Sequence, residues 1–160
     1  WEVGGGLPDL AVFGDDTWEE QVVREYYLAW HRFGHAAMEL FRTLPGDDCA
    51  GECPEGCECE RTMAVTLEAA RYAYSKLDTA QQGYIAKGLA VPFNWDGAVE
   101  QNLGDISEEE GNAVMALRYW ARYLDRKDQQ DIGRNVIQRK VQALKEQAIG
   151  VAEYRFPVDG

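Results

Sequence analysis

The stretch that decides the fold reads Ser107-Glu108-Glu109-Glu110-Gly111-Asn112-Ala113-Val114 and runs on to Leu124. Ser107 can cap the first free backbone N–H groups of a helix, and Glu110 can reach back to the Ser107 N–H, which makes a capping box. The three carboxylates would then lie at the positive end of the helix dipole. Apolar residues follow at three- and four-residue steps, with Trp120 beside them: Val114, Leu117, Ala121 and Leu124. The stretch therefore predicts an amphipathic helix that begins at Ser107.

A second capping box, Thr17-Trp18-Glu19-Glu20, predicts a long helix that runs to about Thr43 and stops before Leu44-Pro45-Gly46. Its predicted apolar stripe consists of Val22, Tyr26, Trp30, Phe33, Ala37 and Phe41. His31 and His35 lie one turn apart, with Glu39 continuing the row, which is a spacing that can hold a metal. We favour the other interpretation, two histidines that flank a packed face, because the sequence identifies no third ligand.

Further helices are expected over residues 60–77, with an apolar row from Met63 to Leu77, and from Asp78 as cap to Lys87, with Gly88 as the stop. Phe93 and Trp95 form either a contact patch or the cover of a core, and residues 98–106 are a link. After Asp128 we expect a helix to about Lys140, which interrupts the apolar row there. Two interpretations compete beyond that point. One is a continued helix, whose apolar row is Ile132, Val136, Leu144 and Ala148; the other, which we favour, is a strand and turn or an extended arm over residues 141–156.

These segments predict a mainly α protein, a bundle of about four to five helices in one domain. The Gly-rich N-terminus is read as an extended arm, and the C-terminus as a hairpin or extended arm. The predicted parts are an arm at 1–16, a long helix at 17–44, a Cys-rich loop at 45–59, a helical body at 60–127 and a C-terminal helix and arm at 128–160.

All four cysteines fall in one loop rich in Gly, Pro and acidic residues: Cys49, Cys53, Cys57 and Cys59. Four thiolates can enclose a tetrahedral zinc ion, although the spacing C-x3-C-x3-C-x-C is not the usual pair of C-x2-C knuckles. Two disulfides that pinch the loop and four free thiols are the alternatives. None of the three implies catalysis, because no cysteine has an adjacent histidine to act as a base.

The chain is strongly acidic, with 28 Asp and Glu against 16 Lys and Arg and a net charge of −12. A surface that binds duplex DNA needs clustered positive charge, so sequence-specific nucleic-acid binding is not expected. No run approaches the roughly 18 apolar residues of a membrane span. No phosphate-binding loop, nucleophile elbow or paired-carboxylate motif appears, and we therefore expect a structural protein rather than an enzyme.

The C-terminal third carries a resemblance to a known family. A capped apolar helix at Ser107–Leu124, a polar break and then Lys145, Glu146, Ile149, Gly150 and Tyr154 resemble the C-terminal half of tailed-phage head–tail connector proteins, also called adaptor or head-completion proteins. The resemblance implies a virion protein, assembled in the host cytoplasm, that forms an oligomeric ring. It also implies that the ring joins the portal protein to the tail-completion proteins.

In that interpretation the tail is an interface, anchored by Val151, Tyr154 and Phe156. The alternative is a small helical protein or enzyme subunit that binds zinc through its four cysteines. Zinc is accordingly the one cofactor that the sequence suggests.

Overall fold

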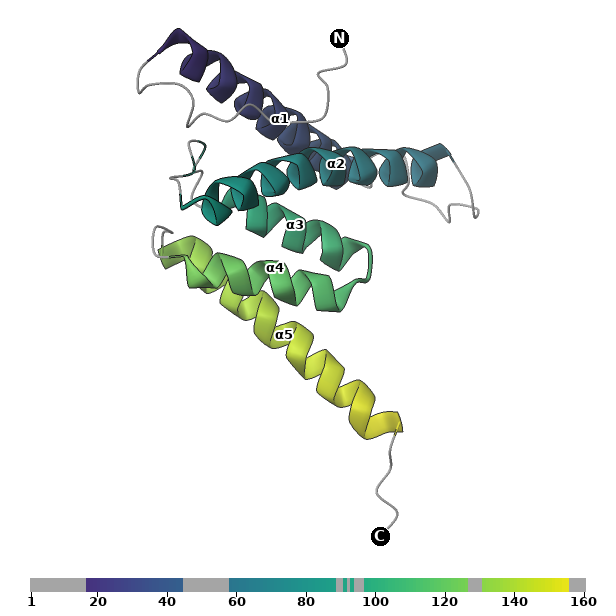
Figure 1. Ribbon diagram of the computed structural model, residues 1–160. Coiled ribbons are helices and arrows are strands. Elements are labelled where there is room, and N and C mark those ends of the chain that lie inside the picture. The colour runs from purple at the N-terminus through teal and green to yellow at the C-terminus, as the bar shows by residue number, and fades with distance from the viewer. Residues whose placement is uncertain are drawn as a thin grey trace. The chain divides into compact units, whose positions relative to one another are not determined.

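The protein is almost entirely helical where its structure is described. The structure is a computed structural model, and it describes residues 17–44, 58–88, 91, 93, 97–126 and 131–155. Within these ranges it has five helices and no strand (Figure 1), so the predicted mainly α class and the number of helices are confirmed. The predicted N-terminal arm at 1–16 lies outside the described residues.

The chain divides into two compact units, Trp1–Asn94 and Trp95–Gly160, which are described in turn. The prediction of a single domain stays a prediction, because the compactness of each unit does not decide whether the two fold together.

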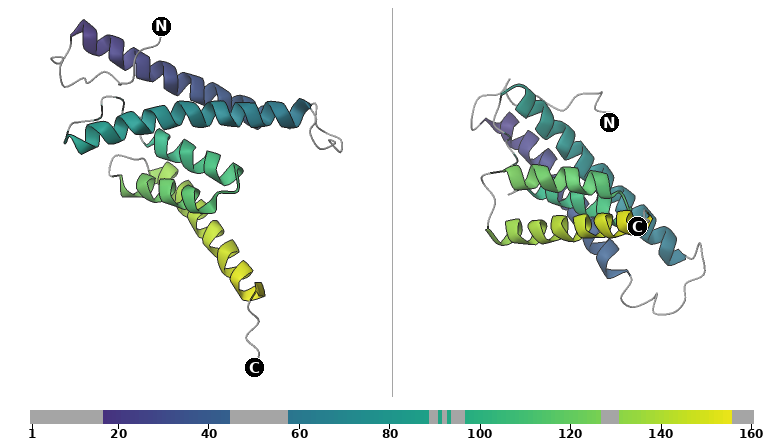
Figure 2. Two further views of the ribbon diagram at one scale, coloured as in Figure 1. Left: turned by 45° about the vertical axis from the view of Figure 1, so that its right-hand side comes forward. Right: turned by 90° about the horizontal axis from the view of Figure 1, so that it is seen from below.

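The first unit is a pair of long helices, α1 (Trp18–Thr43) and α2 (Glu58–Ala86), that run in opposite directions (Figures 1 and 2). The buried side of α1 carries Val23, Tyr27, Gly34 and Met38. The buried side of α2 carries Thr66, Ala70, Ala73, Tyr74, Leu77, Ala80, Gln81 and Tyr84. A Cβ atom on Gly34 would lie 2.9 Å from Tyr74 Cε2 and 3.1 Å from Ala73 Cβ, so glycine is what allows the two helices to approach here.

Helix α2 is continuous, and the predicted break at Asp78 is wrong. Asp78 lies inside the helix, where its carboxylate accepts a hydrogen bond from the Gln82 side chain one turn later. The predicted stop is confirmed, because Gly88 adopts a left-handed conformation (φ 68°) and donates its N–H to the Ile85 carbonyl at 3.0 Å. Phe93 is buried against Tyr27, with ring centroids 4.3 Å apart, and therefore covers a core.

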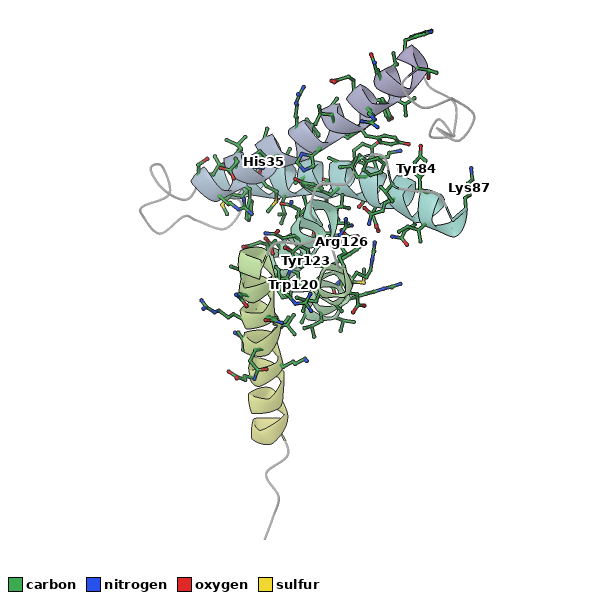
Figure 3. All side chains as sticks on the ribbon, turned by 90° about the vertical axis from the view of Figure 1, so that its left-hand side faces the viewer. His35, Tyr84, Lys87, Trp120, Tyr123 and Arg126 are labelled. Carbon is green, nitrogen blue, oxygen red and sulfur yellow. The ribbon has the colours of Figure 1, made fainter. Side chains whose placement is uncertain are left out.

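The second unit contains α3 (Ala98–Glu109), α4 (Ala113–Asp125) and α5 (Asp131–Arg155). Helices α3 and α4 form a hairpin, and α5 leaves the end of α4 and runs on past it (Figures 1 and 2). The buried cluster consists of Ala116, Trp120, Tyr123 and Ile137, with Leu124, Val141 and Leu144 packed against it. Trp120 and Tyr123 lie on successive turns of α4, with Arg126 one turn further on (Figure 3). A Cβ atom on Gly104 would collide with the Trp120 indole.

The predicted capping box at Ser107 is wrong. Ser107 is fully buried inside α3, and its hydroxyl donates to the Leu103 carbonyl at 2.7 Å. The next helix is capped by Asn112, whose side chain accepts from the Met115 N–H at 3.2 Å. Gly111, with φ at 71°, makes the turn between the two helices. The three glutamates therefore end one helix instead of starting the next, and the expected link at residues 98–106 belongs to α3.

The predicted face of α4 is right for Leu124, which packs against the buried cluster beside Trp120, and wrong for Val114 and Ala121. Ala116, Trp120 and Tyr123 are buried, whereas Val114 is 77% exposed and Ala121 is exposed. The burial of Trp120 fixes this rotation, since the indole is the largest apolar group on the helix.

The strand and turn expected after Lys140 are wrong, because α5 is helical to Arg155. Gly150 lies within this helix, where it costs about 1 kcal/mol relative to Ala. The good helix formers around it, among them Lys145, Glu146 and Gln147, outweigh that cost. Among the early α5 residues whose side chains are described, Ile137 is fully buried and Val136 is exposed, while the Ile132 side chain lies outside what the structure describes.

Candidate functional site

The first unit leaves an apolar face of α1 on its outside. Six residues on this face are all apolar and all exposed, and we call them the α1 seam: Val22, Tyr26, Ala29, Phe33, Ala36 and Leu40. The four large members are 56%, 37%, 50% and 49% exposed in chain order. A continuous apolar surface of this kind on a soluble helix marks an interaction site more often than chance exposure does.

The spacing within the α1 seam is four, three, four, three and four residues. This is the heptad pattern, with an average period of 3.5 residues, that keeps one stripe of a helix against a partner helix along its length. Val22 to Leu40 covers five helical turns, or ~27 Å at 1.5 Å per residue. The α1 seam therefore has the geometry of a surface built to receive another helix.

Aromatic rings border the α1 seam on the side of α2. The half-buried Trp30 makes edge-on contacts with Tyr26, Phe33 and Tyr72, with centroid separations of 6.3, 6.1 and 5.5 Å. Tyr72 on α2 is half exposed, and the Lys76 ammonium lies over its ring at 5.3 Å. Edge-to-face contacts of this kind are favourable, so the rings pack against one another along the border of the α1 seam.

The apolar stripe predicted for α1 is on the wrong side of the helix. Val22, Tyr26 and Phe33 are exposed, and Trp30, Ala37 and Phe41 are only half buried. The core stripe lies one residue further along, at Val23, Tyr27, Gly34 and Met38. Helix α1 thus carries two apolar stripes, and the sequence pattern alone does not say which of them faces α2.

Among the described residues, His31, His35 and Glu39 are not placed together as a group that could hold a metal ion. His31 is half buried, and its ring packs edge-on against Tyr74, with centroids 5.9 Å apart. Burial lowers the pKa of His31, and the nearby His35 lowers it further. Glu39 pairs instead with Arg42 at 3.0 Å. The packed-face interpretation of the histidines accounts for His31, while His35 is exposed (Figure 3).

Tyr74 contributes a buried hydroxyl to the same region. Its side chain is fully buried, and the hydroxyl oxygen has no hydrogen-bond partner in the described part of the chain. Burial raises the pKa of Tyr74 to about 12, against the opposing pull of the Arg42 charge. The hydroxyl therefore stays protonated throughout the physiological pH range.

The second unit contains a charged cluster around Trp120. The Lys140 ammonium lies 3.1 Å from Asp105 Oδ1, 2.8 Å from Glu108 Oε2 and 5.2 Å from the centre of the Trp120 ring. The Trp120 indole N–H donates to the same Asp105 oxygen at 3.2 Å. Lys140 thus connects α5 to α3 and covers one face of the tryptophan on α4.

The pKa of Lys140 is raised. Burial is the largest single influence and lowers it, but the combined hydrogen bonds and negative charges of Glu108 and Asp105 outweigh burial. The ammonium is therefore stabilised in its charged form. The Lys140 ammonium, the two carboxylates and the indole N–H in these contacts join α3, α4 and α5.

A second charged cluster joins α3 to the end of α4. Glu100 is almost fully buried, and its two carboxylate oxygens lie 3.5 Å from Arg122 and 3.6 Å from Arg126. Leaving a carboxylate buried without its cations would be strongly destabilising. The two arginines therefore supply the positive charge that compensates the buried Glu100 carboxylate.

The other predicted site residues are outside what the structure describes. Cys49, Cys53 and Cys57 lie in residues that are not described, and Cys59 is described only as part of the α2 backbone. Val151 and Tyr154 are described only as backbone of α5, and Phe156 not at all. The zinc site and the tail interface therefore stay predictions.

Two features are absent from the described ranges. No group of three or more His, Cys, Asp and Glu side chains is placed there to hold a metal ion. None of the described helices is long and apolar enough to cross a membrane.

Sequence reasoning missed Lys140 as an ion-pair centre, although the signal was visible. A lysine that interrupts an apolar row is a candidate partner for buried acids, and Asp105 and Glu108 stand three apart on a preceding helix. The sequence gives no means of knowing that α5 packs beside α3.

Comparisons with known proteins add no relative to this picture: no protein-family model, no curated protein and no solved structure matches the chain.

Proposed function

We propose that this chain is a structural subunit that acts by binding other proteins, without catalysis, as a head–tail connector in a phage-like particle. The observation that carries the proposal is the α1 seam, an exposed apolar surface five turns long. A surface of this size on a folded unit is explained by a protein partner. The portal, the tail-completion proteins and other copies of the chain in a ring are the partners that the family resemblance implies.

The charge distribution is compatible with this function. Helix α1 has four Glu and three Arg, a net charge of −1, so almost all of the chain's net charge of −12 lies elsewhere. The interaction surface is therefore nearly neutral, while the rest of the subunit repels nucleic acid. A ring through which DNA passes needs both properties.

The tail residues that carry the resemblance are helical in the structure. Residues Lys145, Glu146, Ile149, Gly150 and Tyr154 belong to helix α5. We therefore propose that the end of α5 contacts its neighbour as a helix, through Val151 and Tyr154, with Phe156 beyond it.

The test is the mass of the full chain in solution and its shape in negative-stain electron micrographs, with reducing agent present so that cysteines do not cross-link copies. We expect oligomers, including rings, and no measurable affinity for duplex DNA at physiological salt. A chain that stays monomeric at all concentrations, alone and with portal protein, would contradict the proposal. Tight and salt-sensitive DNA binding would contradict it equally.

A further inference from the structure

We propose that the α1 seam binds the α1 seam of a second copy of this chain, with the two helices antiparallel and related by a two-fold axis. The inference rests on the proposed function only in taking this face as a protein-binding surface, and it does not require a ring. The evidence lies in the order of large and small residues, in the charges along α1 and in the area that the pair would bury.

The first argument is the match between large and small side chains. If the two helices run antiparallel about a centre near His31, Val22 lies opposite Leu40 of the second copy, Tyr26 opposite Ala36 and Ala29 opposite Phe33. Every layer then joins either a large with a small side chain or two aliphatic side chains. Such layers interdigitate at a nearly constant distance between the helix axes, as well-packed cores require. All six residues of the α1 seam are used.

A parallel pair lacks this match. Tyr26 would face Tyr26 of the second copy and Phe33 would face Phe33, while Ala29 and Ala36 would each face an alanine. Wide layers would alternate with narrow ones, and cavities would remain at the alanine layers. The residue order therefore selects the antiparallel arrangement.

The second argument is the charge along α1. Its N-terminal half, residues 18–30, has three Glu and one Arg, whereas residues 31–43 have two Arg and one Glu. In an antiparallel pair each acidic half lies beside the basic half of the other copy. The two helix dipoles also run in opposite directions, which is favourable. A parallel pair would place like halves together.

The third argument is the buried area. The exposed fractions of Tyr26, Phe33 and the bordering Tyr72 give ~280 Å² per copy, taking ~200 Å² for a fully exposed aromatic side chain. With Val22 and Leu40 the surface is ~450 Å² per copy, so a symmetric pair would bury about 900 Å², which is in the range of weak, reversible interfaces below about 1,200 Å². The apolar surface is therefore sufficient for a weak, reversible dimer.

The experiment exchanges the large and the small residue of one layer. Phe33→Ala leaves a small residue opposite Ala29, and Ala29→Phe places two large residues in the same layer. The double variant Ala29→Phe/Phe33→Ala restores one large and one small side chain per layer, in swapped positions. Both sites are exposed, so each variant keeps the fold, which circular dichroism checks. Ile85→Ala, half exposed on α2 and outside the α1 seam, is the matched control.

Sedimentation velocity over a concentration series, in reducing buffer, gives the dissociation constant of the dimer. We expect each single variant to raise it about tenfold or more, as for a central interface side chain, while the double variant returns close to the parent and Ile85→Ala does not change it. Single variants that associate like the parent, or a double variant weaker than both, would overturn the pairing.

The same data separate this inference from the proposed function. Association that stops at two copies and responds to the layer exchange supports the pairing and contradicts the ring. A large assembly that none of the variants changes overturns the pairing and leaves the ring in place.

Discussion

The two units pack their amphipathic helices in different ways. The second unit has three helices around Trp120, and charged side chains from two of them close over the indole. The first unit is a pair of helices, and a pair can bury only one stripe of each helix. Since α1 carries two apolar stripes, the second stripe remains outside as the α1 seam.

The difference indicates where each unit's function lies. In the second unit the charged side chains around Trp120 join the unit's own helices, so substitutions in this cluster should change stability. A unit with an apolar stripe left over is incomplete, and substitutions on that stripe should change association more than folding. Four predictions, taken from the largest expected effect to the smallest, examine this contrast.

The largest effect is expected for Trp120→Ala, which removes the centre of the second unit. Burial of the whole indole predicts a loss of about 3–5 kcal/mol in the free energy of unfolding. The control is Trp18→Ala, at a residue that is 69% exposed, for which we expect a change within about 0.5 kcal/mol. Denaturant unfolding of the two variants measures both values. Similar losses would mean that the exposed face of α1 also supports the fold.

Two glycines inside helices give the next prediction. Gly104→Ala forces a methyl group into the Trp120 indole and should cost about 1–3 kcal/mol by overpacking. Gly83→Ala has open space around the new methyl group and should stabilise the chain by about 0.5–1 kcal/mol, because alanine favours the helix. Thermal unfolding should therefore shift in opposite directions for the two variants. A shift in the same direction would contradict the close approach of α3 to α4.

Lys140→Met tests the charged cluster. Removal of the ammonium leaves Asp105 and Glu108 facing each other, and we expect a loss of about 1–2 kcal/mol, less than for a fully buried pair because Lys140 is one-third exposed. The matched control Arg42→Met breaks the exposed pair with Glu39 and should cost less than about 0.5 kcal/mol. Urea unfolding at neutral pH compares the two.

The raised pKa of Lys140 determines the pH range over which Lys140 stabilises the folded chain. The lysine is charged in both the folded and the unfolded chain below its ordinary pKa, so its full contribution is present there. The contribution is lost as the pH rises from the ordinary pKa through the raised one. The parent and Lys140→Met should therefore converge in stability at strongly alkaline pH, and a constant difference would contradict the ion pair.

The smallest effect concerns His31 in the first unit. Its pKa is lowered by burial and by His35, so the unfolded chain binds a proton at a higher pH than the folded chain does. Stability should therefore be full above about pH 6.5 and fall as the pH drops below that value. His31→Gln should reduce the slope by at most about 1.4 kcal/mol per pH unit. Unfolding curves measured between neutral and mildly acidic pH check this, and an unchanged slope would contradict the burial of the imidazole.

Much of the helical fold follows from the sequence. The spacing of apolar residues predicted the mainly α class, and the Thr17 region and Gly88 marked two helix ends at about the right residues. These features are local, because they depend on backbone hydrogen bonds and turn residues within a few positions. The sequence also contained the whole heptad pattern of the α1 seam.

Which apolar stripe faces inward was decided only by tertiary packing. On α1 two stripes lie one residue apart, and the close approach at Gly34, where the Tyr74 ring fits against the backbone, selected the second. On α4 the burial of Trp120 selected the face. Ser107 looked like a helix cap because acidic residues follow it. In the structure the acids Asp105 and Glu108 bind Lys140, which lies 32 to 35 residues away in the chain. The sequence shows a lysine that interrupts an apolar row, but only the tertiary structure shows which acids it binds, because the partners are far apart along the chain.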